Sequence, residues 1–273
     1  MKPIGVFDSG VGGLTVLAAL RHAMPAEDFI YLGDTARLPY GTKSSDTVAR
    51  YSLQCAEALV ARGIRCLVVA CNTASALGLE VLRVRHPGLA VMGVIEPGAQ
   101  AAVAISSSQH IAVIGTEGTI KGGAYQAAIR RLNPLARVVA APCSLFVALA
   151  EEGWTTGHIA EATAQRYLGP LFASDPGGVP DTLVLGCTHF PALAAPIRKA
   201  LPMQVRIVDS DQTTAAAVAR ELAVREAPRG QLHGGSRGSV RWLATDGAAR
   251  FARASRTFLG EALRAADIEI IDL

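Results

Sequence analysis

The chain has few aromatic and few charged residues, and it lacks long apolar stretches. Of its 273 residues, 5% are aromatic and 18% are charged, whereas 50% are hydrophobic. A chain this rich in apolar residues can bury a sizeable core, so it is not of the disordered class. No stretch of 18 apolar residues occurs, and we therefore expect no membrane-spanning segment.

Basic segments are missing as well. Arginine outnumbers lysine 22 to 4, but the formal net charge is only +3. No basic run carries the interleaved aromatic residues that are typical of nucleic-acid-binding chains. We therefore expect no nucleic-acid partner.

The cysteines do not form a disulfide pattern. There are five, an odd number, in a chain that is not small. Residues 1–7 are too short an apolar segment for a signal peptide and are interpreted as a first strand. Reduced thiols and a cytoplasmic location are the better interpretation.

Short apolar runs alternate with amphipathic stretches along the whole chain. Helical spacing is clearest at 16–24, 47–63 and 249–260. This alternation predicts an α/β fold with mostly parallel sheets flanked by helices. The predicted strands are 4–8, 29–34, 66–72, 91–97 (closed by Pro97), 110–119, 137–143, 181–189, 205–210 and 239–246.

A weak internal repeat suggests two copies of one α/β fold, although chance similarity between buried strands is the alternative. LVVACNTASA and LVLGCTHFPA align as an apolar strand, a small residue, a cysteine and polar residues. Pro97-Gly98 is the best candidate for a domain crossing, and Asp209 for the return. The predicted domains are 1–97 plus 209–273, and 98–208. The Gly/Pro/Ser-rich stretches 174–180 and 229–239 are predicted to be surface loops.

Two of the cysteines, Cys71 and Cys187, each lie at the end of an apolar strand. Open α/β sheets bind their ligands at the carboxyl ends of the strands. Two thiols in similar positions therefore suggest two half-sites that face one ligand. A buried cysteine is often inert, and we assign Cys55, Cys66 and Cys143 to the core on that ground.

The turn DSGVGG (8–13) follows the first strand and precedes a helix. Its glycines could bring backbone N–H groups close to an anion, or they could simply form a tight turn. The dinucleotide-binding pattern does not fit, because Thr15 stands where its third glycine is needed. Similarly, GDTARLPYGTKS (33–44) is either a ligand loop or a plain connection.

His189 follows Cys187 by two residues. One interpretation is a zinc site made with Cys71 and Asp8, but no close C-x-x-C spacing accompanies it. The other is an acid/base partner that tunes the thiol, because the thiolate is the reactive form. Lys43 and Lys121 have no phosphate-binding pattern near them that would indicate pyridoxal phosphate.

These residues, in this order and spacing, resemble the glutamate racemases of the aspartate/glutamate racemase superfamily. The matching segments cover nearly the whole chain: GVFDSGVGGLTVL, YLGDTARLPYG, VVACNTASA, VIEPG, VIGTEGTI, LVLGCTHFP, VDS and WLATDGAARFARASRTFLG. The resemblance implies two pseudo-symmetric α/β domains with glutamate, a small-molecule substrate, in the cleft between them. It also implies no cofactor, neither pyridoxal phosphate nor a metal, and D-glutamate supply for peptidoglycan synthesis. It leaves open whether the chain forms a homodimer.

The resemblance also assigns roles to residues. Cys71 and Cys187 would be the two bases, the first acting on D-glutamate and the second on L-glutamate. Asp8 and His189 would be auxiliary acid/base groups, and Glu151, in the variant segment FVALAEEG, would join them. The substrate would be lined by Asp8, Ser9, Tyr40, Gly41, Asn72, Thr73, Thr116, Thr119, Thr188 and His189.

Two other functions stay open at this point. A relative acting on aspartate or another acidic amino acid would carry the same thiols, because pocket depth is not visible in a sequence. A non-catalytic module that binds an acidic ligand is the alternative from a different class, although the chain retains all five side chains to which the resemblance assigns a catalytic role.

Overall fold

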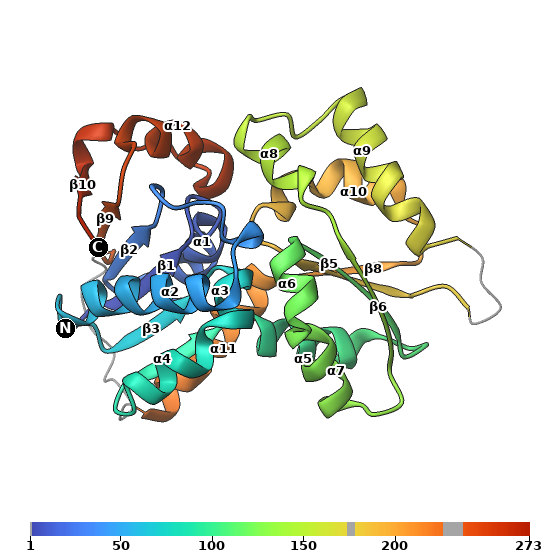
Figure 1. Ribbon diagram of the computed structural model, residues 1–273, viewed down its shortest axis with the longest axis horizontal. Coiled ribbons are helices and arrows are strands. Elements are labelled where there is room, and N and C mark those ends of the chain that lie inside the picture. Colours follow the sequence, from blue (N-terminus) through green and yellow to red (C-terminus); the bar gives the residue numbers. More distant parts are fainter. Residues whose placement is uncertain (1, 174–177, 226–236) are drawn as a thin grey trace.

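A computed structural model describes residues 2–173, 178–225 and 237–273 and contains two parallel sheets (Figure 1). The first has six strands in the order β10-β9-β2-β1-β3-β4, and every neighbouring pair is parallel. Its strands are β1 (Ile4–Asp8), β2 (Phe29–Gly33), β3 (Cys66–Val69), β4 (Ala90–Gly93), β9 (Val240–Ala244) and β10 (Ile268–Ile270).

The second sheet has four parallel strands in the order β6-β5-β7-β8. They are β5 (His110–Gly115), β6 (Arg137–Pro142), β7 (Thr182–Gly186) and β8 (Arg206–Asp209). This order repeats the order β2-β1-β3-β4 within the first sheet. The two sheets are therefore topological copies, as the internal repeat predicts.

Helices cover both faces of each sheet. The helices of the first sheet are α1 (Leu14–Ala23), α2 (Ser45–Val60), α3 (Asn72–Leu77), α4 (Leu79–Arg85), α11 (Ser210–Arg225) and α12 (Ala248–Leu259). Those of the second are α5 (Ile95–Ile105), α6 (Glu117–Gly122), α7 (Ala124–Leu132), α8 (Leu145–Glu151), α9 (His158–Leu168) and α10 (Ala194–Ala200). Short 3-10 turns cover Tyr40–Thr42, Gly169–Leu171, Phe190–Leu193 and Ala265–Asp267.

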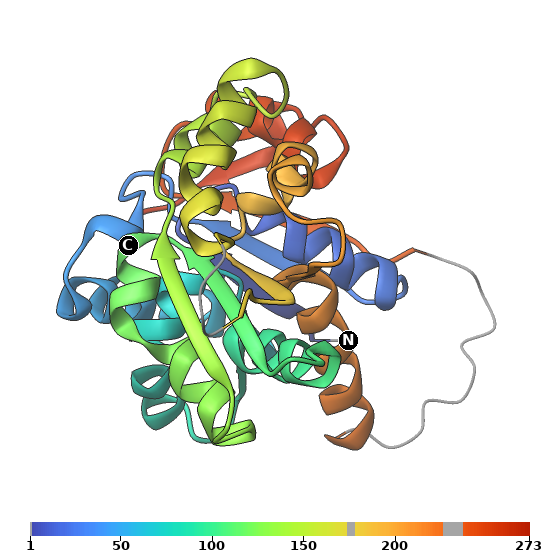
Figure 2. The ribbon, with the colours of Figure 1, turned by 90° about the vertical axis from the view of Figure 1, so that its right-hand side faces the viewer.

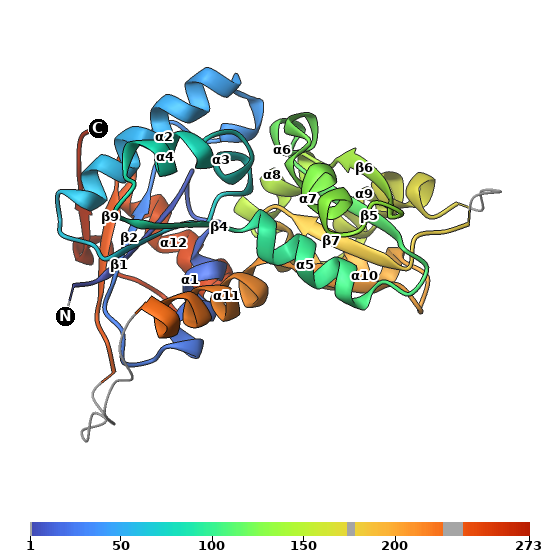
Figure 3. The same ribbon diagram turned by 90° about the horizontal axis from the view of Figure 1, so that it is seen from below.

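We call each sheet with its helices a lobe. In the first lobe α1 packs against α11 and α12, and α2 packs against α3 and α4. In the second lobe α5 packs with α7, and α9 packs with α10 on the opposite side of the strands (Figures 1 and 3). Figure 2 shows the second lobe facing the viewer, with β5 and β6 running side by side.

The core follows from the alternation of side chains along parallel strands that are buried on both faces. Ile4 and Val6 of β1 belong to the apolar layer under α1. Phe7 belongs to the separate layer under α2. The layer under α1 continues into the second lobe through Ala99 and Ile111, so one apolar core joins the two lobes.

Most of the predicted strands are present, with differences at their carboxyl ends. The strands predicted at 66–72 and 110–119 end at Val69 and Gly115. The reason is that Cys71 and Thr116 are helix N-caps, whose side chains accept backbone hydrogen bonds from the following turns. The site residues therefore lie at helix starts just beyond the strands.

Two expectations about elements were wrong or incomplete. Pro97 does not close a strand, because β4 ends at Gly93 and Pro97 lies in the first turn of α5. Proline is accepted there because the first helical N–H groups have no intrahelical partner. The edge strand β10 was not predicted, since it is only three residues long.

The domain boundaries stay a prediction. The grouping of the strands supports them, because β1–β4 precede Pro97, β9 and β10 follow Asp209, and all six form the first sheet. The predicted loops 174–180 and 229–239 lie mostly outside the described residues. No helix in the described ranges is both long and apolar enough to cross a membrane.

Burial of α1 against the first sheet leads to a stability prediction. Leu20 is fully buried, whereas Leu135 is 78% exposed. We expect Leu20→Ala to lower the free energy of unfolding by about 2–5 kcal/mol through lost burial and a residual cavity. Leu135→Ala, the same chemical change on the surface, should cost less than about 0.5 kcal/mol. Urea unfolding followed by circular dichroism measures both, and equal losses would contradict this account of the core.

Candidate active site

The carboxyl ends of equivalent strands carry the predicted site residues. Asp8 ends β1, and Cys71 follows β3 by two residues. In the second lobe Thr116 follows β5, and Cys187 directly follows β7. Because β1 corresponds to β5 and β3 to β7, the two cysteines occupy matching positions at the ligand-binding ends of the two sheets.

Cys71 is a buried thiol with one hydrogen-bond donor and one acceptor beside it. Its Sγ accepts a hydrogen bond from the Ala74 N–H at 3.4 Å, and the thiol donates to Ser9 Oγ at 3.5 Å. Burial, and next the negative charge of Asp8, raise the pKa of Cys71 to about 12. The thiol is therefore protonated at neutral pH in this arrangement.

Cys187 has a histidine beside it. Its Sγ lies 3.8 Å from His189 Nδ1, and the other ring nitrogen, Nε2, lies 3.2 Å from Glu151 Oε1. Burial opposes a charge on His189, but its contacts with Cys187 and Glu151, together with the charge of Asp8, outweigh it and raise its pKa to about 10. His189 is therefore an imidazolium at neutral pH.

Asp8 links the two lobes. Its Oδ2 accepts the Gly10 N–H at 2.9 Å, and its Oδ1 accepts the Thr188 hydroxyl at 3.5 Å. Burial raises the pKa of Asp8, although the charge of His189 and the hydrogen bonds from Gly10 and Gly13 act in the opposite direction. Asp8 thus lies close to Cys71 and to the Thr188–His189 segment that follows Cys187.

The glycines of the turn 8–13 are needed for space. A Cβ on Gly12 would lie 2.4 Å from Thr188 Oγ1 and 2.5 Å from His189 Nδ1. A Cβ on Gly13 would lie 2.5 Å from the Cβ of Asp8. These separations leave no room for a side chain, so the turn packs directly against the Cys187 loop of the other lobe.

Three threonine hydroxyls form a second contact between the lobes. Thr73 from α3 lies 2.9 Å from Thr116 and 3.1 Å from Thr119, measured between the hydroxyl oxygens. Gly41 packs against the same group, since a Cβ there would lie 2.5 Å from the Cβ of Thr116. Predicted substrate-lining residues of both lobes are thus brought together.

Two predicted lining residues, Tyr40 and Asn72, form hydrogen bonds with other side chains of the protein. The hydroxyl of Tyr40 donates to the carboxylate of Asp34. The amide of Asn72 accepts from Tyr125 at 2.8 Å and donates to Ser210 at 3.3 Å. Tyr125 was not identified from the sequence, because nothing distinguishes it from a core aromatic residue of α7.

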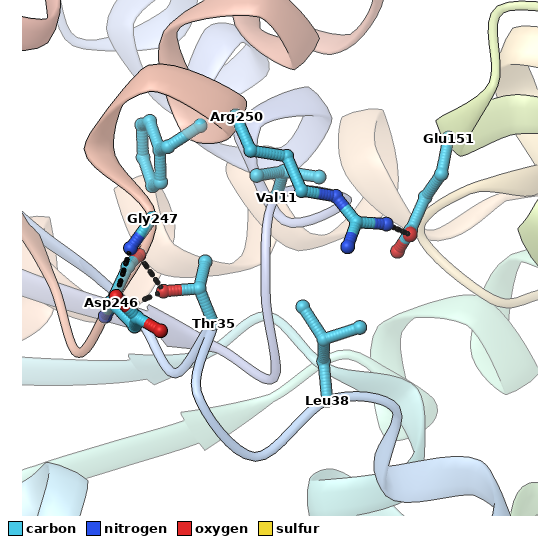
Figure 4. A pocket seen from close by; sticks show the side chains of 8 residues that line it. Val11, Thr35, Leu38, Glu151, Asp246, Gly247 and Arg250 are labelled. Carbon is cyan, nitrogen blue, oxygen red and sulfur yellow. Dashed lines mark hydrogen bonds and ion pairs between the residues drawn. The ribbon is translucent and has the colours of Figure 1, made fainter.

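A pocket of about 110 Å³ opens between the lobes. Figure 4 shows Arg250 reaching from the first lobe to Glu151 of the second across this pocket. Arg250 was not singled out from the sequence either, although it lies in the matching segment WLATDGAARFARASRTFLG. The pocket is lined by Val11, Thr35, Leu38, Glu151, Asp246, Gly247, Arg250 and Phe251.

In the described part of the chain, no group of three or more His, Cys, Asp or Glu side chains could hold a metal ion.

The fold is that of the α/β amino-acid racemases, and its two like sheets each carry a cysteine just beyond a strand end. The Asp/Glu/hydantoin racemase family matches residues 4–219. The chain belongs to this family, and the resemblance inferred from its sequence is confirmed.

Several proteins similar to this chain are named glutamate racemases. A glutamate racemase of Geobacter metallireducens is 51% identical over 259 residues, which cover 95% of this chain and 93% of the relative. The crystal structure of a glutamate racemase isoform from Bacillus anthracis superposes with a TM-score of 0.90 at 33% identity, covering 100% of this chain and 98% of that one. A glutamate racemase of Francisella tularensis, solved with D-glutamate, gives a TM-score of 0.89 at 33% identity and covers 99% and 97% of the two chains.

The close approach of Gly12 to the other lobe leads to a second prediction. Gly12→Ala must push the turn away from Thr188 and His189, so we expect kcat/KM for racemisation to fall by at least about tenfold, equivalent to roughly 1.4 kcal/mol. Gly10→Ala is the control, because its Cβ would lie 3.4 Å from Leu38 Cδ2, an ordinary contact. Unaltered kinetics in Gly12→Ala would show that the lobes do not pack this way during turnover.

The raised pKa of His189 leads to a third prediction. A basic group whose pKa rises from 6.5 to about 10 on folding stabilises the protein fully below pH 6.5, and this contribution disappears as the pH rises through about 10. The stability difference between the wild type and His189→Gln should therefore shrink between pH 6.5 and 10. Urea titrations across this range measure it, with His158→Gln at the exposed start of α9 as the matched substitution. A difference that does not change with pH would rule out the imidazolium.

Proposed function

We propose that the chain is a glutamate racemase that interconverts L- and D-glutamate by two-base proton transfer between Cys71 and Cys187. The observation that carries the proposal is the matching position of two buried thiols at equivalent strand ends of two sheets that share a four-strand order. Glutamate as the substrate is supported by the names of the similar proteins and by the Francisella tularensis structure that contains D-glutamate.

Two bases suit the stereochemistry. Racemisation removes a proton from a tetrahedral carbon and replaces it on the opposite face. A single base returns the proton to the face from which it came unless it moves around the carbon. Two groups on opposite faces invert the centre in one passage through the site, one taking the proton and the other then giving its own.

The surroundings of the two sulfurs differ in a way that suits this exchange. The imidazolium of His189 lies 3.8 Å from the Cys187 sulfur, whereas burial and Asp8 keep Cys71 protonated. We propose that the reaction of L-glutamate starts with Cys187 as the thiolate. In this charge state Cys187 would take the α-proton of L-glutamate and the Cys71 thiol would deliver its proton to the other face. The sulfurs then hold the opposite charge state, in which the reverse reaction starts from D-glutamate.

The intermediate carbanion needs stabilisation by the protein. Its charge spreads onto the α-carboxylate, where hydrogen-bond donors that are already oriented act most strongly in a site with little water. The hydroxyls of Ser9, Thr73 and Thr188 are such donors, and Thr73 and Thr188 are buried between the lobes. We therefore propose that the reaction needs no cofactor.

The remaining parts of the proposal concern the cell. A racemase of this specificity would supply D-glutamate for peptidoglycan synthesis in the cytoplasm, where its thiols stay reduced. Assembly as a homodimer belongs to the same proposal.

The fourth prediction tests the two bases directly. Cys71→Ala and Cys187→Ala should each lower racemisation by more than about 10³-fold, since each removes one proton-transfer group. Cys66→Ala is the matched control, because Cys66 is a buried cysteine at the opposite end of β3. Circular dichroism at a fixed wavelength follows the loss of the signal of L-glutamate as it racemises, and L-aspartate is assayed alongside.

Several outcomes would overturn the proposal. An active single-cysteine variant would exclude the two-base mechanism. Faster turnover of aspartate would change the substrate, and glutamate binding without any change in rotation would indicate a binding module. In D2O, deuterium should appear first in the product enantiomer, whereas simultaneous labelling of both enantiomers would indicate one base.

A further inference from the structure

Both oxygens of the Glu151 carboxylate are bound, each by a different lobe. Oε1 lies 3.2 Å from His189 Nε2 within the second lobe. Oε2 accepts from Arg250 Nη2 of α12, in the first lobe, at 2.7 Å. The carboxylate is therefore fixed at two points, and its position depends on a side chain from the opposite lobe (Figure 4).

The helix α12 contacts the site histidine through a second side chain. The ring of Phe258 packs edge-on against the His189 ring, with 5.1 Å between the ring centres. Arg250 and Phe258 are eight residues apart, so they lie near the same face of α12, two turns from each other. One face of this helix thus makes two contacts with the site. Phe258 packs directly against the imidazole of His189, and Arg250 binds the Glu151 carboxylate that contacts the same imidazole.

The ion pair has little value as a stabilising contact alone. The Arg250 side chain is 58% exposed, whereas that of Glu151 is 11% exposed. Ion pairs with a solvent-exposed partner contribute little to folding. What the contact does control is the direction of a nearly buried carboxylate whose other oxygen binds His189.

We propose that Arg250 is a positioning residue that holds Glu151 against His189 and so keeps the imidazole directed at Cys187, an inference that rests on the proposed function. Because the ion pair spans the two lobes, it forms only when they approach as closely as they do here. Arg250 therefore connects the closing of the site to the orientation of its histidine.

The fifth prediction is kinetic. Arg250→Gln should lower kcat roughly tenfold in both directions while KM changes less than about twofold, because the residue orients a group and does not touch substrate. The acid limb of the pH profile should move to higher pH, since Glu151 loses a cation that lowers its pKa. Arg250→Lys should recover most of the wild-type kcat and of the wild-type pH profile. Arg253→Gln replaces an exposed arginine on the same helix and should change neither kcat nor the pH profile.

A second measurement does not depend on turnover. Three groups control the charge of His189: Cys187 on its own loop, Glu151 from α8 and Asp8 from β1. NMR titration of labelled histidines gives its midpoint in the wild type, Arg250→Gln, Glu151→Gln and the double variant. If Arg250 acts through Glu151, Arg250→Gln should lower the midpoint towards that of Glu151→Gln and change nothing further in the double variant.

The direction in which the His189 midpoint moves in Arg250→Gln distinguishes positioning through Glu151 from the alternatives. Removing a cation that acts only by its charge would raise the midpoint of His189, and a purely structural contact would leave it unchanged. Either result, or a kcat of Arg250→Gln equal to that of the wild type, overturns the proposal. If no protein, including the wild type, racemises glutamate, the proposed function fails, but the titration still tests the positioning role. Arg250→Met is the second variant should Arg250→Gln lose its native circular dichroism.

Discussion

The site depends on a contact that admits no side chain: the turn after β1 lies directly against the loop after β7. Gly12 faces Thr188 and His189 at distances that exclude even a methyl group. This approach brings Asp8 within reach of the Thr188 hydroxyl and encloses the polar groups of both loops in the protein. The unusual charge states of the site follow from this enclosure, because burial in a low-dielectric surrounding strengthens each electrostatic interaction.

Burial and charge compensation determine which groups are ionised. Asp8 and Cys71 both lose water, and burial raises the pKa of each. His189 is equally buried, yet it gains a proton, because Cys187, Glu151 and Asp8 surround it with negative charge or acceptors. The result is an ordered series of groups from Asp8 through His189 to Glu151 and, at the surface, Arg250. The proposed reaction uses the inner members, and the outer pair is proposed to keep them oriented.

The two lobes share a strand order but not the chemistry at the strand ends. Each has a central strand, a neighbour on either side and a cysteine after the third strand. Cys71 is surrounded by Ser9, an N–H group and Asp8, whereas Cys187 is beside an imidazolium. A backbone repeated in this way places two thiols in equivalent positions. The two sulfurs therefore have different neighbours, as a proton donor and a proton acceptor require.

Much of the fold could be predicted from the sequence because its determinants are local. Buried parallel strands appear as continuous apolar runs, and β1, β2, β5 and β9 all begin within one residue of the predicted starts. That Cys71 and Cys187 follow equivalent strands could be predicted from their similar contexts, whereas their action on one substrate stays a prediction. What the sequence could not determine were contacts between distant segments. That Gly12 is needed for space, that Asn72 is held by Tyr125 and Ser210, and that Arg250 reaches Glu151 depend on how the two lobes pack. Local residue patterns do not encode that packing, since it depends on the shape and charge of surfaces that meet only in the folded protein.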